Sequence, residues 1–340
     1  MVATDMQSSN REFDPKKNNG MEPIKSCLNR STSDAIKPGE INSTTMQGTT
    51  SIIVAIPAFN EEIAIAGVVL RSLKYVDKVI VINDGSRDKT KEVAELAGAE
   101  VLEHNKNIGK GTAIKDAFDY AKNVNADILV TIDGDGQHNP DEIPLVLGPI
   151  LKGQADIVNG SRFLNKNGHI VPRYRQIGQE ILTIATNIGM NACITDSQNG
   201  FRAFSKKTFN AFSFKQYGMA IESEMLIEAS DAYLRITEVP INVRYNVEGS
   251  TYNPVAHGIT VLWKLILLIS QRKLFLVFCL AGIIFLSIGS VFAVLTNDIF
   301  NNAYNIMIIY IMLCVLYILL GISITFTGLI LALARKIKSK

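Results

Sequence analysis

The sequence has few cysteines, a single tryptophan and almost no excess of charge. Its four cysteines are scattered along 340 residues, without the spacing of a metal site or of a disulfide framework, and this usage is typical of a reducing, cytosolic environment. The 34 Lys and Arg residues nearly balance the 32 Asp and Glu residues, which leaves a net charge of +2. Such a balance argues against nucleic acid as the main partner.

The first 48 residues lack the apolar stretch of a signal peptide. They are rich in Ser, Thr, Asn and Lys, and they hold too few apolar residues to build a core. This composition predicts a disordered polar tail over residues 1–48. No internal repeat is evident in the remainder, and the folded part is expected to begin at residue 49.

Short apolar runs alternate with amphipathic segments after the tail. The runs are β-branched and end in polar or glycine-containing loops, which predicts strands, while the segments between them have helical spacing. The expected strands cover residues 51–56, 78–82, 101–102, 128–132 and 156–158, and the expected helices cover residues 58–73, 88–97, 109–122 and 141–151. This alternation implies right-handed crossovers and a mostly parallel sheet covered on both faces.

Three polar motifs directly follow expected strands. They are Pro57–Glu61, Asn83–Ser86 and Asp133–Asp135. Because ligands of such sheets bind at the carboxyl ends of the strands, we expect the three motifs to lie along one edge of the sheet, around one site.

The third motif has the form of a cation site. Asp133 and Asp135 are separated by one glycine, and such paired carboxylates can bracket Mg²⁺ or Mn²⁺, with Gln137 as a further oxygen donor. Taken alone, the same pattern is more often a solvated loop or a helix cap. An EF-hand is excluded, because its sixth and twelfth positions require Gly and Glu, where this chain has His138 and Pro144.

Taken together, the motifs resemble glycosyltransferase family 2. Between residues 51 and 258 they appear in that family's order: Pro-Ala-Phe-Asn-Glu, Asn-Asp-Gly-Ser-x-Asp, Asn-x-Gly-Lys-Gly, Asp-Gly-Asp-x-Gln-His, Gly-Ser-Arg-Phe and Gly-Phe-Arg-Ala-Phe. Within the family, the chain is most similar to dolichol-phosphate mannose synthase and related polyprenyl-phosphate hexose synthases. The resemblance implies a catalytic domain with the GT-A fold, which is α/β and Rossmann-like, over residues 49–255.

The resemblance also assigns roles to individual residues. The nucleotide sugar would be bound by Pro57, Phe59, Glu61, Ile82, Asp84, Asp133, Gly134, Asp135, Arg244 and Ser250. The divalent metal, Mg²⁺ or Mn²⁺, would be held by Asp133, Asp135 and Gln137. It would neutralise the charge that develops on the leaving diphosphate. The catalytic residues would be Asp133, Asp135, Arg162 and Asp196.

Some of these residues have a simpler interpretation. Phe59 could pack in the core instead of stacking on a base or ribose. Lys110 could approach a phosphate, although a solvated helix start is equally consistent with its position. Glu222 and Glu224 could be ordinary acids in the first turn of a helix.

The acceptor implied by the resemblance is a dolichyl or polyprenyl phosphate. Arg162 and Arg175 resemble the arginines that bind its phosphate, a task that suits the bidentate guanidinium, although both could be surface charges near a membrane. An anionic phosphate can attack the anomeric carbon without a protein base, and in-line attack inverts that carbon. Two alternatives remain: a non-processive transferase with a glycolipid or polysaccharide hydroxyl as acceptor, for which Asp196 is the best base, and an inactive membrane scaffold.

The C-terminal part of the chain holds two long uncharged apolar runs, over residues 274–296 and 306–334. Each run exceeds the roughly 20 residues that cross a bilayer. Residues 256–273 before them form an amphipathic pattern with Trp263, which favours an interfacial helix. Four glycines could pack the two membrane helices together or against other chains: Gly282, Gly289, Gly321 and Gly328.

Lys and Arg residues flank the outer ends of the hairpin, and the short segment between the two runs has none. The positive-inside rule therefore predicts an integral protein of the cell membrane, with both termini and the catalytic domain in the cytoplasm. The expected partners are a nucleotide sugar, dolichyl or polyprenyl phosphate, and membrane lipid. A UDP-hexose is favoured as donor, with GDP-mannose as the alternative, and the membrane helices are compatible with a homo-oligomer.

Overall fold

The structure of this chain is a computed structural model. It describes residues 50–164, 173–190, 193–215, 218, 220–244, 260–267, 274–299 and 304–338. Three predictions lie outside the described residues: the tail over residues 1–48, the role of Ser250, and the side-chain role of Arg175.

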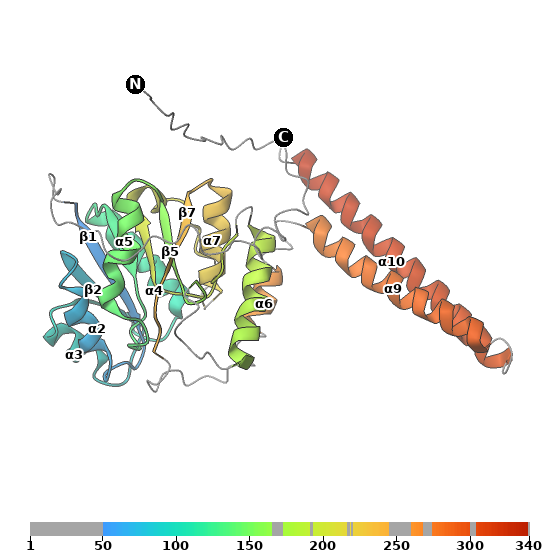
Figure 1. The fold of residues 1–340 in the computed structure, drawn as a ribbon, viewed down its shortest axis with the longest axis horizontal. Coiled ribbons are helices and arrows are strands. Elements are labelled where there is room, and N and C mark those ends of the chain that lie inside the picture. The colour runs from blue at the N-terminus through green and yellow to red at the C-terminus, as the bar shows by residue number, and fades with distance from the viewer. Residues whose placement is uncertain are drawn as a thin grey trace, which may run out of the picture.

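A mixed seven-stranded sheet forms the centre of the α/β domain (Figure 1), with strand order β3-β2-β1-β4-β6-β5-β7. Its strands are β1 Ile52–Ala58, β2 Lys78–Asn83, β3 Glu100–Glu103, β4 Ile128–Thr131, β5 Ile157–Ser161, β6 Arg202–Ser205 and β7 Ile236–Pro240. Strand β6 runs antiparallel to β4 and β5, and the other neighbouring strands are parallel. The predicted mostly parallel sheet is confirmed.

Helices cover both faces of the sheet. They are α2 Ile65–Ser72, α3 Thr90–Leu96, α4 Lys110–Asn123, α5 Ile143–Leu151, α6 Arg173–Gly189 and α7 Ile221–Asp231. Alternate residues of β1 enter two separate cores: Val54 packs with α2, α3 and α5, while Ala55 packs with α4 and α7. Because both faces are buried, β1 is a continuous apolar run instead of an alternating one.

The helix expected from residue 58 begins only at Ile65. Asn60 has a positive φ of 57°, so the backbone first turns at the end of β1 before the helix starts. The amide groups of Asn60 and Glu61 donate to Ser86 Oγ and Thr90 Oγ1, at 2.9 and 2.8 Å. The motif is therefore a loop fixed to the neighbouring β2–α3 segment, as a ligand-binding strand end requires.

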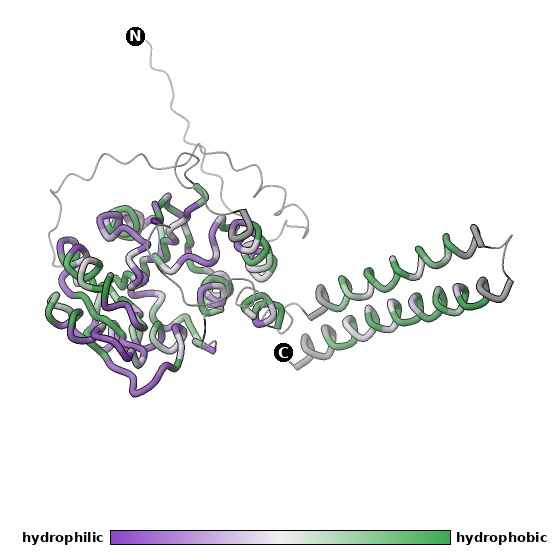
Figure 2. Tube along the Cα trace, turned by 90° about the horizontal axis from the view of Figure 1, so that it is seen from below, coloured by the Kyte–Doolittle hydropathy of each residue, from purple (hydrophilic) through white to green (hydrophobic). Residues whose placement is uncertain are grey.

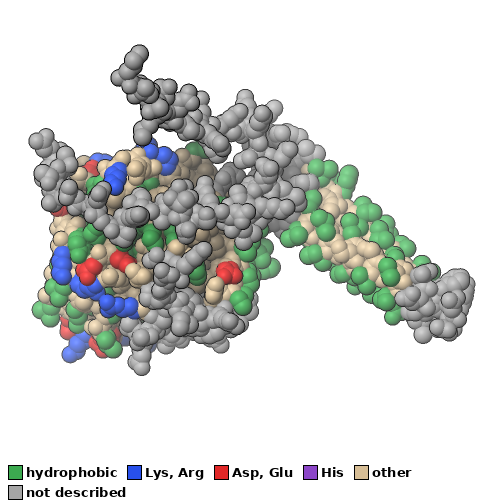
Figure 3. Space-filling model, viewed as in Figure 1, with side chains coloured by type: hydrophobic (Ala, Val, Ile, Leu, Met, Phe, Trp, Pro, Cys, Tyr) green, Lys and Arg blue, Asp and Glu red, His purple; other side chains and the backbone are tan. Residues whose placement is uncertain are grey.

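Two apolar helices, α9 Leu274–Ile299 and α10 Tyr304–Lys338, form the hairpin that projects from the α/β domain in Figure 1. Their apolar stretches, Phe278–Leu295 and Ile308–Leu331, are long enough to cross a membrane. Only 11% and 6% of these stretches are buried, so they are not core helices. Figure 2 shows that the described part of the hairpin is mostly hydrophobic, and Figure 3 shows hydrophobic side chains on its surface.

The four hairpin glycines lie between α9 and α10. A Cβ atom at Gly282 would overlap Thr325, and one at Gly328 would overlap Phe278. The other two close approaches have the same form: a Cβ at Gly289 would lie 2.9 Å from Ile318, and one at Gly321 would lie 2.7 Å from Leu286. Of the two arrangements that the sequence allows, the structure therefore shows packing within one chain.

One expectation about the cysteines is wrong. Cys193 is disulfide-bonded, whereas Cys279 and Cys314 are free thiols in the hairpin helices. Pairing depends on distance in the folded chain, so scattered positions in the sequence do not exclude it. Cysteine usage alone therefore does not establish a reducing compartment.

Candidate active site

The three strand-end motifs meet at one edge of the sheet, as predicted. Strand β1 lies between β2 and β4, with Ala58 paired to Asn83 and Ala55 paired to Thr131. A Cβ at Gly134 would lie 3.3 Å from the carbonyl oxygen of Pro57. The loop that carries Asp133 and Asp135 thus packs directly on the end of β1.

Asp133 is paired with a buried lysine. Lys110 Nζ, at the start of α4, lies 2.5 Å from Asp133 Oδ1 and 2.9 Å from an oxygen of Glu222 on α7. Burial alone would raise the pKa of Asp133, but the charge of Lys110 and the nearby His138 hold it below its ordinary value. These contacts exclude the interpretation of Lys110 as a solvated residue.

Gly200 is required where the β4 loop meets the segment before β6. A Cβ there would lie 2.7 Å from both carboxylate oxygens of Asp133 and 2.8 Å from Lys110 Nζ. The Gly200 carbonyl also accepts a 2.8 Å hydrogen bond from Thr131 Oγ1. Only a residue without a side chain leaves Asp133 and Lys110 in place.

Asp135 and Glu61 form the electronegative part of the site. Burial and the charge of Asp133 raise the pKa of Asp135. Burial, then the charges of Asp135 and Asp133, raise the pKa of Glu61 to about 7. Gln137 contacts Asp135 through its backbone, since its N–H donates to Asp135 Oδ1 at 3.0 Å.

The donor set fits a hard cation that is completed by its substrate. Among the described residues, no group of three His, Cys, Asp or Glu side chains is arranged to hold a metal. Asp133 and Asp135 supply two carboxylates, which is the usual protein contribution to Mg²⁺ sites that take their other ligands from phosphate oxygens and water. The mutual repulsion of these carboxylates also favours a bound cation.

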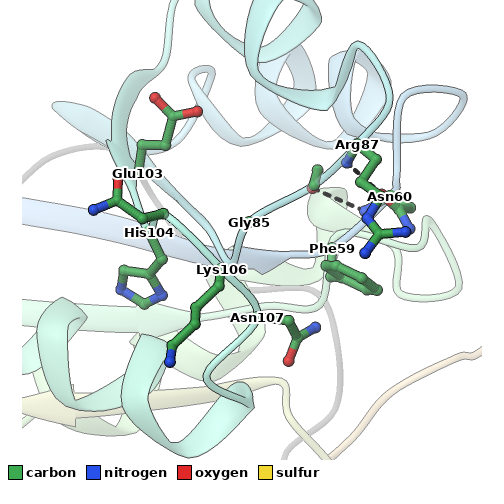
Figure 4. Close-up of a pocket in the computed structure, with 10 residues that line it drawn as sticks. Phe59, Asn60, Gly85, Arg87, Glu103, His104, Lys106 and Asn107 are labelled. Carbon is green, nitrogen blue, oxygen red and sulfur yellow. Dashed lines mark hydrogen bonds between the residues drawn. The ribbon is translucent and has the colours of Figure 1, made fainter.

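A cavity of about 670 Å³ opens at the ends of β1, β2 and β3 (Figure 4). It is lined by Phe59, Asn60, Gly85, Ser86, Arg87, Glu103, His104, Asn105, Lys106 and Asn107. Its volume falls within the usual range for small-molecule sites. Phe59 is partly exposed and lines this cavity, which excludes the alternative of core packing.

Asp84 holds one wall of the cavity in place. Its carboxylate accepts hydrogen bonds from the amide groups of Ile108 and Gly109, at 2.9 and 2.7 Å. His104 Nδ1 lies 2.7 Å from Asp84, and its Nε2 lies 2.8 Å from Asp116. Asp84 therefore fixes the loop that leads into α4 and thus into Lys110.

Pro57 and Ile82 occupy paired positions in the β1–β2 ladder. Ile82 is fully buried in the core against α4 and does not line the cavity, so the predicted contact of its side chain with the nucleotide is not seen here. Arg244 reaches the Asp-x-Asp loop through its backbone, because its N–H donates to Gln137 O at 2.9 Å.

Arg162 and Asp196 form a bidentate ion pair. Arg162 Nε and Nη2 donate to the two carboxylate oxygens of Asp196, at 2.7 and 2.8 Å. Asp196 is completely buried; burial alone would raise its pKa, but the charge of Arg162 lowers it. Both oxygens of the proposed base are therefore engaged by Arg162, which weakens the alternative of a hydroxyl acceptor.

Sequence reasoning singled out Arg202 in the Gly-Phe-Arg-Ala-Phe motif but missed two polar residues in the same row of the sheet, Asn159 in β5 and Glu238 in β7. Arg202, fully buried, donates from Nε to Asn159 Oδ1 at 2.8 Å and from Nη1 to the carbonyl of Glu222 at 2.8 Å. Glu238 in β7 contacts Asn159 and the residues around Asp196. An Asn or Glu in the middle of a short apolar strand is the signal that could have revealed them, because buried polar groups need partners.

Comparison with known proteins agrees with this geometry. Residues 53–215 match the model of glycosyl transferase family 2. The uncharacterized protein MJ1222 of Methanocaldococcus jannaschii is 36% identical over 64% of this chain and 91% of its own length. The UDP-N-acetylglucosamine–dolichyl-phosphate N-acetylglucosaminyltransferase of Methanococcus voltae is 34% identical over 64% of this chain and 95% of its own length.

A dolichyl-phosphate hexose transferase of Haloferax volcanii is 27% identical over 62% of this chain and 90% of its own. Among solved structures, the chain resembles glucosyl-3-phosphoglycerate synthase from Mycobacterium tuberculosis in complex with Mn²⁺, UDP-glucose and phosphoglyceric acid. That likeness has a TM-score of 0.53 and 25% identity, over 66% of this chain and 80% of the other. The chain therefore belongs to glycosyl transferase family 2, and its catalytic domain has the GT-A fold.

Proposed function

We propose that this protein transfers a hexose from a nucleotide sugar to a dolichyl or polyprenyl phosphate at a membrane surface, with inversion of the anomeric carbon. The observation that carries the proposal is the combination, in one chain, of the Asp133–Asp135 pair at the sheet edge with an apolar hairpin just beyond the catalytic domain. The names of the relatives from Methanococcus voltae and Haloferax volcanii, both of which act on dolichyl phosphate, support the same acceptor.

The donor would occupy the cavity beside Phe59, with its diphosphate toward Asp133 and Asp135. When bound, Mg²⁺ or Mn²⁺ would supply charge neutralisation of the leaving diphosphate, held by these two carboxylates and by Gln137. Arg244 and Ser250 would close over the donor. A UDP-hexose is favoured, because a UDP-sugar appears in the name of one relative and UDP-glucose in one solved neighbour.

The acceptor phosphate would bind Arg162 and Arg175. An anionic phosphate needs no protein base, and the engagement of Asp196 by Arg162 leaves the hydroxyl-acceptor alternative without its best candidate. Asp196 would then act by orienting Arg162. Catalysis would rest on positioning and on electrostatic stabilisation of the leaving group.

Helix α6 supports a lipid acceptor, because its apolar side faces outward. Four isoleucines at helical spacing are exposed: Ile177, Ile181, Ile184 and Ile188. Its inner side carries Thr183 and Thr186, which bond to Ser197 and Ser223. Helix α6 packs with the helical residues 260–267, which expose Trp263, and it lies on the side of the domain nearest the hairpin in Figure 1. These surfaces fit a bilayer interface.

The full-length protein in lipid vesicles would test the proposal. It is incubated with labelled UDP-glucose, UDP-N-acetylglucosamine or GDP-mannose, with polyprenyl phosphate, and with Mg²⁺, Mn²⁺ or a chelator. We expect label in the lipid phase that is labile to mild acid and is lost with the chelator. Transfer to free polyprenol as efficient as transfer to its phosphate, or no transfer from any donor, would overturn the proposal.

A further inference from the structure

Three polar side chains from neighbouring strands occupy one row of the sheet. Asn159 in β5 is the register partner of Arg202 in β6 and of Glu238 in β7. Directly paired residues point to the same face and come close enough to interact. Asn159 bonds to both neighbours, because its Oδ1 accepts from Arg202 Nε at 2.8 Å and its Nδ2 donates to Glu238 Oε1 at 3.0 Å.

The row ends on the segment that carries Asp196. Glu238 Oε2 accepts from the N–H and the hydroxyl of Thr195, at 2.7 and 2.9 Å. Glu238 Oε1 accepts from the N–H of Asp196 at 3.3 Å, and Asn159 Nδ2 donates to the Asp196 carbonyl at 2.8 Å. The backbone of Asp196 is thus held on both its N–H and its carbonyl side.

Asp196 in turn sets the direction of Arg162. Its carboxylate accepts two bonds from the guanidinium and a 3.2 Å bond from the Arg162 N–H. Thr195 reinforces the arrangement, since its hydroxyl lies 2.6 Å from Ser161 Oγ in the residue before Arg162. A shift of the Thr195–Asp196 backbone would therefore rotate the guanidinium away from its present direction.

We propose that Glu238 is a positioning residue, which fixes the orientation of Arg162 toward the acceptor phosphate through Thr195 and Asp196. The inference rests on the proposed function of Arg162. A carboxylate is required at this position because both of its oxygens only accept. Glu238→Gln would present an NH₂ group to an N–H donor, and the segment would lose at least one of its bonds.

The chain offers a matched control in Glu228 of α7. Its carboxylate also holds the N–H of a hydroxyl residue, Ser213, at 2.8 Å, and accepts from the Ser213 hydroxyl. Glu228 is buried and Glu238 is partly buried, and Ser213 lies outside the segment that holds Arg162. Glu228→Gln therefore alters the same kind of carboxylate hydrogen bonds without changing the segment that orients Arg162.

The experiment measures KM for polyprenyl phosphate, KM for the nucleotide sugar and the melting temperature, using full-length protein in vesicles. For Glu238→Gln we expect KM for the acceptor to rise about tenfold, the effect of losing one hydrogen bond to a charged group, with KM for the donor unchanged. For Glu228→Gln we expect both KM values to stay at the wild-type level, even where the melting temperature falls equally.

Thr195→Val is a second variant for the case in which Glu238→Gln does not fold. It removes only the hydroxyl bonds of Thr195, and we expect a smaller rise in KM for the acceptor alone. If wild-type protein transfers sugar to polyprenyl phosphate but the Glu238 and Thr195 variants change both KM values together, or neither, this inference is overturned. If wild-type protein transfers nothing to polyprenyl phosphate, the proposed function itself fails.

Discussion

Charge balance between single side chains shapes the donor half of the site. The negative charges of this cluster raise the pKa of Asp135 and of Glu61. The pKa of Asp133 is lowered instead, because the charge of Lys110 lies beside it. Asp133 is thus kept ionised, whereas the ionised form of Asp135 is destabilised by the negative charge of Asp133. This division explains why one carboxylate is preorganised while the other gains most from a cation.

Asp135→Asn should abolish metal-dependent transfer, with a loss of about 100-fold or more, because the substituted amide contributes no charge to the cation. The melting temperature of the metal-free protein should not fall, since the substitution removes repulsion from Asp133. Asp141→Asn is the control, because Asp141 is a surface carboxylate bound to Arg71. Transfer at the wild-type rate by the Asp135 variant would refute the metal site.

Lys110→Met should destabilise the protein by about 3 kcal/mol, because removal of one partner leaves buried charges unpaired. The charges in question are those of Asp133 and Glu222. Lys115→Met, which breaks an exposed pair with Asp119, should cost less than about 1 kcal/mol. Denaturant titration in detergent compares the two variants, and equal losses would contradict the buried role of Lys110.

Asp156 should make stability depend on pH. The Arg235 guanidinium beside it lowers the pKa of Asp156 to about 2, against an ordinary value of 3.8. A lowered pKa stabilises the folded state above the ordinary value, and the benefit is lost as pH falls through about 2. We expect Asp156→Asn to cost about 1–2 kcal/mol at pH 7, after allowance for the exposure of Arg235. Unfolding measured from pH 7 downward should show this gap closing below about pH 4, whereas a constant gap would refute it.

Among the described helices of the domain, α6 has apolar side chains on both its inner and its outer side. Leu182 and Ala185 pack toward the domain, while the isoleucines face outward, so burial in this domain alone does not explain the outer isoleucines. The helix follows Arg162 in the chain and carries Arg175 in its first turn. If these arginines bind the acceptor as proposed, an apolar face on α6 would bring them to the level of lipid headgroups.

The double variant Ile181→Ser/Ile184→Ser tests this role of α6. We expect slower transfer to long-chain polyprenyl phosphate in vesicles, by about tenfold, since burial of each isoleucine is worth about 1.5–3 kcal/mol and only part of it bears on docking. Transfer to a short, water-soluble prenyl phosphate should be unchanged. Leu96→Ser, which alters an apolar residue of α3 that is 89% exposed, is the control. Equal losses with both acceptors would rule out membrane docking by α6.

At the scale of the whole molecule, the catalytic sheet and the hairpin were predictable from local pattern. The strand-end motifs around Phe59, Asp84 and Asp133 were assigned to one edge because parallel strands place their carboxyl ends together, and the structure confirms this. The hairpin was predictable from length and composition. Strands β6 and β7 were not predicted, and the four residues of β6 include a buried arginine whose partners lie on β5, on α7 and in the segment before β6.

The local pattern of residues along the chain determined which segments form strands and helices, which loops carry acidic residues, and where the apolar hairpin begins. These features depend on periodicities of two or 3.6 residues, which a linear sequence displays directly. Tertiary structure alone decided that Lys110 neutralises Asp133 and that Asp196 faces Arg162. It also decided that Glu238 accepts a hydrogen bond from Thr195, the residue before Asp196. These contacts join residues 23 to 43 positions apart, and only the pairing of distant strands brings them within hydrogen-bonding distance.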